Sequence, residues 1–267
     1  MALQLSAHRP RPGAGVARAY SFWLLNYRRN FLGSAISSFL APALFLASMG
    51  LGLGSLVDSG ADPALGVPYV AFVAPGVLAA TAMQTGVMCS TFPVMTAMKW
   101  QRQYHAMIAT PLTVLDVLLA HLAYTATRVL LAAGVFLAVA SALGAVPSPW
   151  ALLALPAAVL TGLAHAAPVA AFSAGQETDS GFILLFRLVV TPMFLFSGTF
   201  FPAQDLPAGL EQLAYATPLW HGVDLSRDLA LGAPDAGSAV LHVAYLALWA
   251  AVGAVLTRRT MARRLLR

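Results

Sequence analysis

The chain has 267 residues, of which 59% are hydrophobic and only 9% are charged, and its formal net charge is +5. Soluble domains carry about 25% charged residues, so a soluble fold is excluded and the apolar surface requires a bilayer. The positive charges flank apolar segments, which indicates a basic membrane face near anionic lipid rather than nucleic-acid binding. The single cysteine excludes disulfides and cysteine-ligated metal sites within one chain.

The alternation of charge along the chain predicts an even number of membrane spans, with both termini in the cytoplasm. Twelve of the 15 basic residues precede the first apolar segment, occupy one internal loop or form the tail. Seven of the ten acidic residues lie in the alternate connections. The basic residues are Arg9, Arg11, Arg18, Arg28, Arg29, Lys99, Arg102, Arg258, Arg259, Arg263, Arg264 and Arg267, and the acidic ones are Asp58, Asp62, Asp205, Glu211, Asp224, Asp228 and Asp235.

Six apolar segments reach the roughly 20 residues that cross the hydrocarbon core of a bilayer. They predict an all-α integral membrane protein with a cytoplasmic N-terminal segment (1–30), a transmembrane domain (31–257) and a basic cytoplasmic tail (258–267). The six spans are expected at about 32–57, 68–95, 113–144, 150–173, 181–201 and 237–257.

The N-terminal segment contains an amphipathic helix that is suited to lie along the inner membrane interface. Apolar and aromatic residues recur there at i, i+4, i+7, i+8 and i+11, and the basic neighbours can reach the lipid headgroups. The recurring residues are Val16, Tyr20, Trp23, Leu24 and Tyr27.

The internal basic loop, 96–110, repeats this pattern on a smaller scale. An apolar helical face beside basic residues suits docking into a groove of a partner subunit. The expected face carries Trp100, Tyr104, Met107 and Ile108, and the flanking polar residues include Lys99, Arg102 and His105. A second and shorter connection on the same side, 175–179, is acidic.

The outer connection 202–238 alternates apolar and polar residues, as in Leu206, Leu210 and Leu213. This alternation predicts short helices that lie in the outer leaflet or dip into it. Such backbone is tolerated at membrane depth only where protein or a wet cavity covers it.

Several polar residues fall at the start of the third span or inside it. Asp116 follows Thr113 by three positions, which favours a capping box. An arginine at mid-bilayer costs about 3 kcal/mol, so Arg128 is expected to face protein or water. Two interpretations of its helical face stay open, a polar lining of a translocation path and an interhelical hydrogen-bond network. That face carries His121, Tyr124, Thr125 and Arg128.

The fifth span and the segment after it contain further candidates. Arg187 is expected to pair with Glu177 or Asp179 as a structural tie. The aromatic residues of this region could contact an apolar substrate, and an interfacial aromatic belt is the alternative. The aromatic candidates for the translocation path are Phe194, Phe196, Phe200 and Trp220.

Motifs for catalysis are absent from the sequence. The only lysine lies in Met98-Lys99-Trp100, which is no Walker A motif. Neither H-E-x-x-H nor G-x-S-x-G occurs, and the six histidines lack metal-ligand spacing. We therefore expect no catalytic residue, metal site or cofactor in this chain.

Two segments resemble the ABC-2 type permeases, in the branch that contains nodulation protein J and the daunorubicin-resistance permeases. The first runs from Ala74 to Thr113 and reads APGVLAATAMQTGVMCSTFPVMTAMKWQRQYHAMIATPLT. The second contains FSGTFFP, from Phe196, and YATPLWH, from Tyr215, followed by Arg227 and Gly232. The resemblance covers about residues 20–256.

The resemblance implies six transmembrane helices of the type V exporter kind, an N-terminal interface helix, a coupling helix between spans two and three, and re-entrant helices before span six. It implies a second permease copy, expected as a homodimer, and two separate ATPase subunits that hold ATP and Mg. A second, shorter ATPase contact would fall on Gln176, Glu177 and Asp179. The expected location is the lipid bilayer of the bacterial cytoplasmic membrane.

The expected function is therefore the membrane half of an ATP-driven exporter. Its cargo would be a lipophilic drug or natural product, with antibiotic resistance as the role, or a glycolipid or oligosaccharide. One rival is an integral-membrane lipid-modifying enzyme, which would need clustered acids or histidines at one interface. Another rival is an ion-coupled carrier that uses Asp116, His121 and Arg128. Transport that persists in ATP-depleted vesicles with an ion gradient would favour this carrier.

Overall fold

The computed structural model describes residues 13–29, 44–48, 52 and 67–266, and all regular secondary structure in these ranges is helical. Most of the predicted first span lies outside the described residues, as do residues 58–66 of the outer loop (58–67) that is expected to follow it. The principal helices are α1 (Ala14–Arg29), α4 (Tyr69–Ser90), α5 (Phe92–Lys99), α6 (Gln103–Ile108), α7 (Val114–Ala142), α8 (Ala154–Gly175), α12 (Pro218–Leu231) and α13 (Ala236–Leu265).

Among the described residues, four helical stretches are long and apolar enough to cross a membrane. They coincide with the second, third, fourth and sixth predicted spans, and α4 and α5 together form the first of them. The four stretches are Tyr69–Lys99, Val114–Ala142, Pro149–Gly175 and Ala236–Leu265. The predicted all-α membrane fold is therefore confirmed.

The fifth predicted span, 181–201, is shorter in the structure. It consists of α9 (Ser180–Leu185), a π-helical segment (Phe186–Val190) and α10 (Thr191–Phe196). Pro192 has no N–H to donate to the preceding turn, which favours the wider π geometry just before it. The helix ends at Phe196, because Gly198 adopts a left-handed φ of 75° that turns the chain.

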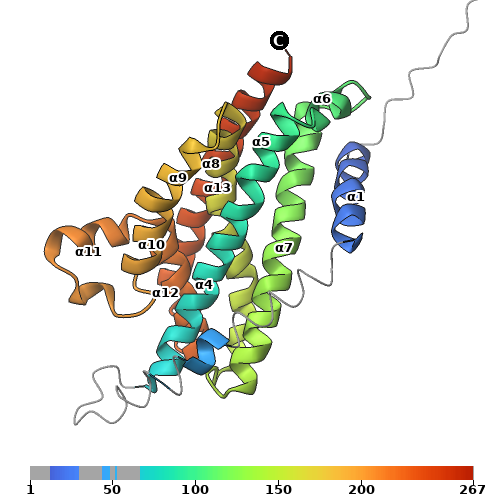
Figure 1. The fold of residues 1–267 in the computed structure, drawn as a ribbon. Coiled ribbons are helices and arrows are strands. Elements are labelled where there is room, and N and C mark those ends of the chain that lie inside the picture. The colour runs from blue at the N-terminus through green and yellow to red at the C-terminus, as the bar shows by residue number, and fades with distance from the viewer. Residues whose placement is uncertain (1–12, 30–43, 49–51, 53–66, 267) are drawn as a thin grey trace, which may run out of the picture.

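The long helices form an upright bundle whose two ends differ (Figure 1). The α5–α6 connection and the C-terminal end of α13 lie at one end, and the α7–α8 connection lies at the other. The internal basic loop and the basic tail therefore share one end of the bundle. We call this end the basic end.

Small residues allow α4, α8 and α13 to approach closely, as is common for helices in membranes. A β-carbon on Gly86 of α4 would overlap the carbonyl of Gly162 in α8. One on Gly253 of α13 would come within 2.5 Å of Pro168. The buried Thr257 hydroxyl donates to the carbonyl of Ala167 at 2.7 Å, so α8 and α13 pack as one unit.

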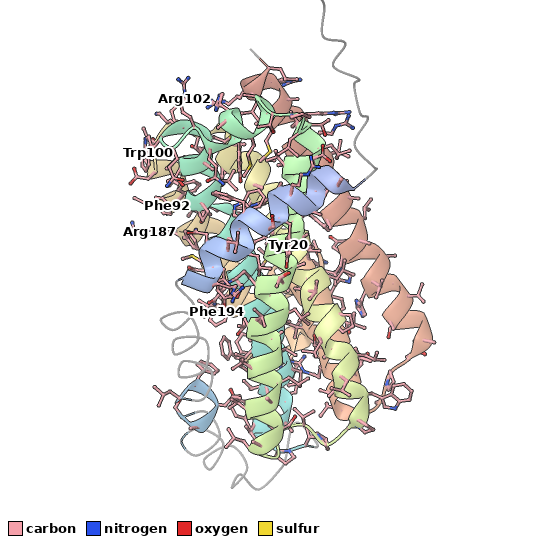
Figure 2. The ribbon with its side chains drawn as sticks, turned by 90° about the vertical axis from the view of Figure 1, so that its right-hand side faces the viewer. Tyr20, Phe92, Trp100, Arg102, Arg187 and Phe194 are labelled. Carbon is pink, nitrogen blue, oxygen red and sulfur yellow. The ribbon has the colours of Figure 1, made fainter. Side chains whose placement is uncertain are left out.

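The amphipathic helix predicted near the N-terminus is α1, and it crosses the outside of α7 obliquely (Figure 2). The hydroxyl groups of Tyr20 and Thr127 lie 2.9 Å apart in a hydrogen bond. At the start of α1, a β-carbon on Gly15 would lie 2.7 Å from the Asp116 carboxyl carbon. Asp116 also completes the predicted capping box with Thr113, which the structure confirms.

The predicted short helices before the last span are also present, as η4 (Ala203–Asp205), α11 (Ala208–Tyr215) and α12. Figure 1 shows α11 projecting from the bundle, whereas α12 lies along it. Arg227 of α12 donates from Nη2 to the carbonyl of Gly198 at 2.7 Å and from Nε to that of Phe72 at 3.2 Å. This arginine fastens the turn after α10 to α4.

Candidate functional site

Three charged residues from distant parts of the chain meet at the basic end. The Glu177 carboxylate lies 3.2 Å from Lys99 Nζ and 2.7 Å from Arg264 Nη1, with one carboxylate oxygen facing each cation. Lys99 Nζ also donates to the Glu177 carbonyl, and Arg264 Nη2 donates to the carbonyl of Gly175 at 2.8 Å. We call Lys99, Glu177 and Arg264 the charge triad.

The charge triad perturbs the acidity of its central member. Hydrogen bonds from Lys99 and then from Arg264 favour the ionised carboxylate, and they hold the pKa of Glu177 below its ordinary value. Glu177 is solvent-exposed, so water and salt screen these interactions. The carboxylate is therefore ionised at neutral pH, and its ion pairs are weak.

The 96–110 loop departs from its predicted geometry. Trp100 and Tyr104 were expected on one helical face, and this expectation is wrong. The helix breaks after Lys99, and Arg102 adopts a left-handed conformation with φ of 50° before α6 begins. As a result, Trp100 is 62% exposed at the tip of the loop, whereas Tyr104 is 1% exposed.

Tyr104 belongs to the core of the basic end rather than to its surface. Its ring lies 6.1 Å from that of Trp23 in α1, and it packs in one cluster with Val94, Val117 and Met261. Burial raises the pKa of the Tyr104 hydroxyl above its ordinary value, so the phenol stays neutral. Tyr104 therefore holds α6 against α1, α5, α7 and α13.

The other residues predicted to contact an ATPase lie on the 96–110 loop, near Trp100, or on the α8–α9 connection. Arg102 is exposed, and His105 and Met107 are half-buried on α6. In the α8–α9 connection Gln176 is half-buried and Asp179 is exposed. Figure 2 shows Trp100 and Arg102 together at this end of the molecule.

A groove of about 840 Å³ opens between α1, α4, α5, α6 and α7. Three of the four polar residues predicted on one face of the third span line it: His121, Tyr124 and Arg128. The described lining includes one cation and no carboxylate. Its remaining residues are Phe22, Trp23, Asn26, Gln84, Thr85, Met88, Cys89, Phe92, Pro93, Thr96, Gln101, Gln103 and Tyr104.

The polar face of α7 contributes both to an interhelical hydrogen bond and to the lining of this groove. His121 Nε2 lies 3.2 Å from the Ser90 hydroxyl, which is an interhelical hydrogen bond between α7 and α4. The Arg128 guanidinium lies 4.5 Å above the ring centre of Tyr27 in α1. Thr125 is fully buried and is absent from the lining. Part of the face is thus a structural network, and part faces the groove.

The aromatic candidates lie elsewhere. Phe194 and Phe200 pack edge to face with ring centres 5.1 Å apart, and Phe196 is 38% exposed on α10. Trp220 packs against Tyr215 at 4.6 Å and against His242 at 5.4 Å. These four residues do not join the groove, so the structure divides the predicted path into two separate regions.

Arg187 does not make its expected ion pair. Among the described residues it forms no salt bridge, and Glu177 is paired with Lys99 and Arg264 instead. The reason is geometric, because the α8–α9 connection turns Glu177 toward the ends of α5 and α13. Arg187 is exposed on the π-helical segment.

The contact made by Arg264 was not predicted, because the basic residues of the tail were interpreted only as evidence for topology. Helix α13 continues through this stretch to Leu265. Thr257, Met261 and Leu265 are buried at a spacing of four residues, and that periodicity is the signal that the helix goes on. The buried pair of His221 and His242, whose Nδ1 atoms lie 2.7 Å apart, was also not predicted.

The described residues contain no group of three or more histidine, cysteine or acidic side chains that could hold a metal ion. Four apolar helices of membrane-spanning length among the described residues define a multi-pass membrane protein. Comparison with known proteins agrees, since the profile of the ABC-2 type transporter family matches residues 19–231. The chain belongs to the ABC-2 type transporter family, in the nodulation protein J branch.

Relatives cover nearly the whole chain. Nodulation protein J of Rhizobium leguminosarum bv. viciae is 35% identical over 252 residues, which are 92% of this chain and 95% of that protein. The protein of the same name from Sinorhizobium fredii is 34% identical over 251 residues, covering 91% and 94%. That of Bradyrhizobium diazoefficiens is 31% identical over 258 residues, covering 94% and 96%.

Proposed function

We propose that this chain is the permease of an exporter that is driven by ATP hydrolysed on a separate ATPase subunit. Family membership implies an ATP-binding partner, and this sequence has no P-loop of its own. ATP and Mg are then held by that partner. The complex contains two ATPase subunits and two copies of this permease in a bacterial plasma membrane.

The observation that carries this proposal is the construction of the basic end. The two connections expected to meet an ATPase, 97–110 and 176–179, are joined to one another through Lys99 and Glu177. Beside them Trp100 is 62% exposed, and tryptophan is enriched among the residues that anchor protein interfaces. Buried aromatic anchors carry much of the energy of protein interfaces.

The orientation follows from charge. The basic residues of the loop and of the α13 terminus lie at one end of the bundle, and the positive-inside rule assigns such an end to the cytoplasm. The α7–α8 connection, α11 and the start of α13 then face outward. Helix α1 lies along the inner half of the bundle, where an amphipathic helix suits the interface.

The groove between α1, α4 and α7 is proposed as part of the translocation path. Its aromatic and amide side chains suit a molecule with both apolar and hydroxylated parts. Among the described lining residues Arg128 is accompanied by no carboxylate, which disfavours a cationic cargo. Within the two cargo classes, this composition favours a neutral or anionic natural product or glycolipid over a cationic drug.

The docking proposal is tested with Trp100→Ala, and Trp150→Ala is the matched control. Trp150 is 54% exposed at the opposite end of the bundle, so its loss removes a similar aromatic surface away from the proposed interface. Losing a buried interface aromatic costs about 2 kcal/mol or more. We expect Trp100→Ala to reduce co-purification of the ATPase at least about tenfold, and Trp150→Ala to leave it unchanged.

Two outcomes would count against the proposal. If the ATPase co-purifies equally with both variants, Trp100 is not part of the interface. If the purified chain hydrolyses ATP without a partner, the proposal of a separate ATPase subunit is wrong.

A further inference from the structure

The charge triad joins three elements that are far apart in sequence. Lys99 ends α5, Glu177 lies between α8 and α9, and Arg264 lies in the last turns of α13. Each Glu177 carboxylate oxygen faces one cation, and each cation also donates to a backbone carbonyl of the α8–α9 connection or its border. The connection is thus held from both sides, with Arg264 on one side and Lys99 on the other.

Arg264 reaches the end of α8 at a position that favours a cation. It donates to the carbonyl of Gly175, the last residue of α8. Carbonyls at a helix C-terminus have no intrahelical partner, and the helix dipole places partial negative charge there. Arg264 therefore satisfies an orphan carbonyl and pairs with Glu177 at once.

The helices behind Arg264 form a stiff unit. Thr257 bonds to Ala167, and Gly253 packs against Pro168, so α13 and α8 have little room to slide. Nearer the opposite end of the bundle, α12 packs against α4, α8 and α13. Arg227 of α12 fastens the turn at Gly198 to α4. A displacement of the Glu177 connection would reach the outer end through these helices.

We propose that Arg264 is a positioning residue for transport, which makes the C-terminal helix a third part of the coupling apparatus beside the 97–110 and 176–179 connections. This inference rests on the proposed function. When the partner subunit moves the Lys99 side of the triad, Glu177 carries that movement to Arg264 and hence to α13 and α8. Exposed ion pairs are weak, so the triad can separate and re-form in each cycle.

The test measures whether ATP binding to the ATPase at the basic end changes the accessibility of a residue at the outer end. Gly209 of α11 is exposed and has no atom within 4 Å of an added β-carbon, so Gly209→Cys suits a reporter. In a Cys89→Ala background, the reconstituted complex with its ATPase is labelled by a membrane-impermeant maleimide. The Cys89→Ala/Gly209→Cys protein is the parent, and the ratio of its labelling rates with and without ATP is the reference value.

Arg264→Gln is expected to reduce that ATP-dependent ratio at least about threefold, within the range that exposed ion pairs contribute, while the ATPase still co-purifies. Arg263→Gln is the control, because Arg263 is the neighbouring exposed arginine and has no described ion pair. It should leave the ratio unchanged. Arg264→Lys keeps the charge and should retain most of the response.

A second variant distinguishes loss of the ion pair from misfolding of the Arg264→Gln protein. Glu177→Gln removes the same pair from its other side and should cause the same loss, with no further loss in the double variant Arg264→Gln/Glu177→Gln. The inference is overturned if Arg264→Gln keeps the full response, if Arg264→Lys loses as much, or if the two losses add. If the parent binds no ATPase or shows no ATP response, the proposed function itself fails, and this inference with it.

Discussion

Gly86 in α4 faces the carbonyl of Gly162 in α8 so closely that a β-carbon at residue 86 would overlap it. Lipid tails give helices little hydrophobic reason to associate, so close backbone contact carries much of the packing. This crossing lies beside the groove, because Gln84, Thr85 and Cys89 line the groove from the same stretch of α4. The position of one wall of the groove therefore depends on a glycine.

We expect Gly86→Ala to destabilise the protein by about 1–3 kcal/mol, the usual cost of overpacking. The measurement is thermal unfolding of the purified protein in detergent. Gly134→Ala in α7 is the matched control, because no atom lies within 4 Å of its added β-carbon. An equal melting temperature for the two variants would contradict the crossing described here.

Tyr104 and Trp100 are expected to respond differently to truncation. Tyr104→Ala empties a fully buried site and should cost about 3–5 kcal/mol, as for other large buried side chains. Trp100→Ala removes an exposed side chain and should change stability by less than about 0.5 kcal/mol. Thermal unfolding of both variants without the ATPase checks this, and a stable Tyr104→Ala protein would show that Tyr104 is not a core residue.

Arg227 should not be replaceable by lysine. Its planar guanidinium donates to two backbone carbonyls and lies 3.9 Å above the Phe72 ring centre, whereas an ammonium cannot reproduce this geometry. Losing a hydrogen bond from a charged group costs about 1.5–3 kcal/mol. Arg227→Lys should therefore lower the melting temperature, and Arg187→Lys, at an exposed arginine without a described ion pair, should not.

The charge triad should depend on pH through Glu177. Because the folded pKa of Glu177 lies below its ordinary value, the pair stabilises the protein above that ordinary value. The stabilisation is lost as pH falls through the lowered folded value. Glu177→Gln mimics the protonated state, so wild type should melt above this variant at pH 7, and the difference should shrink as pH falls below the ordinary pKa of a glutamate. A difference that grows toward acid pH would contradict this sign.

Patterns confined to one segment were readable from the sequence. Apolar length and alternating charge predicted the all-α membrane class and the positions of four spans that the structure contains. The periodicity from Val16 to Tyr27 predicted α1, and the Thr113–Asp116 spacing predicted a capping box. Each of these features depends on neighbours within a few turns of one helix, and hydropathy or helical spacing records such neighbours directly.

Contacts between segments were decided by the tertiary structure. The left-handed turn at Arg102 separates Trp100 from Tyr104, because packing against Trp23 and Met261 draws Tyr104 inward. Glu177 bonds to Lys99, 78 positions away, and to an arginine of the tail rather than to Arg187. A charged side chain can pair with any opposite charge that the fold brings within a few ångströms, so only the approach of the helix ends selects its partner.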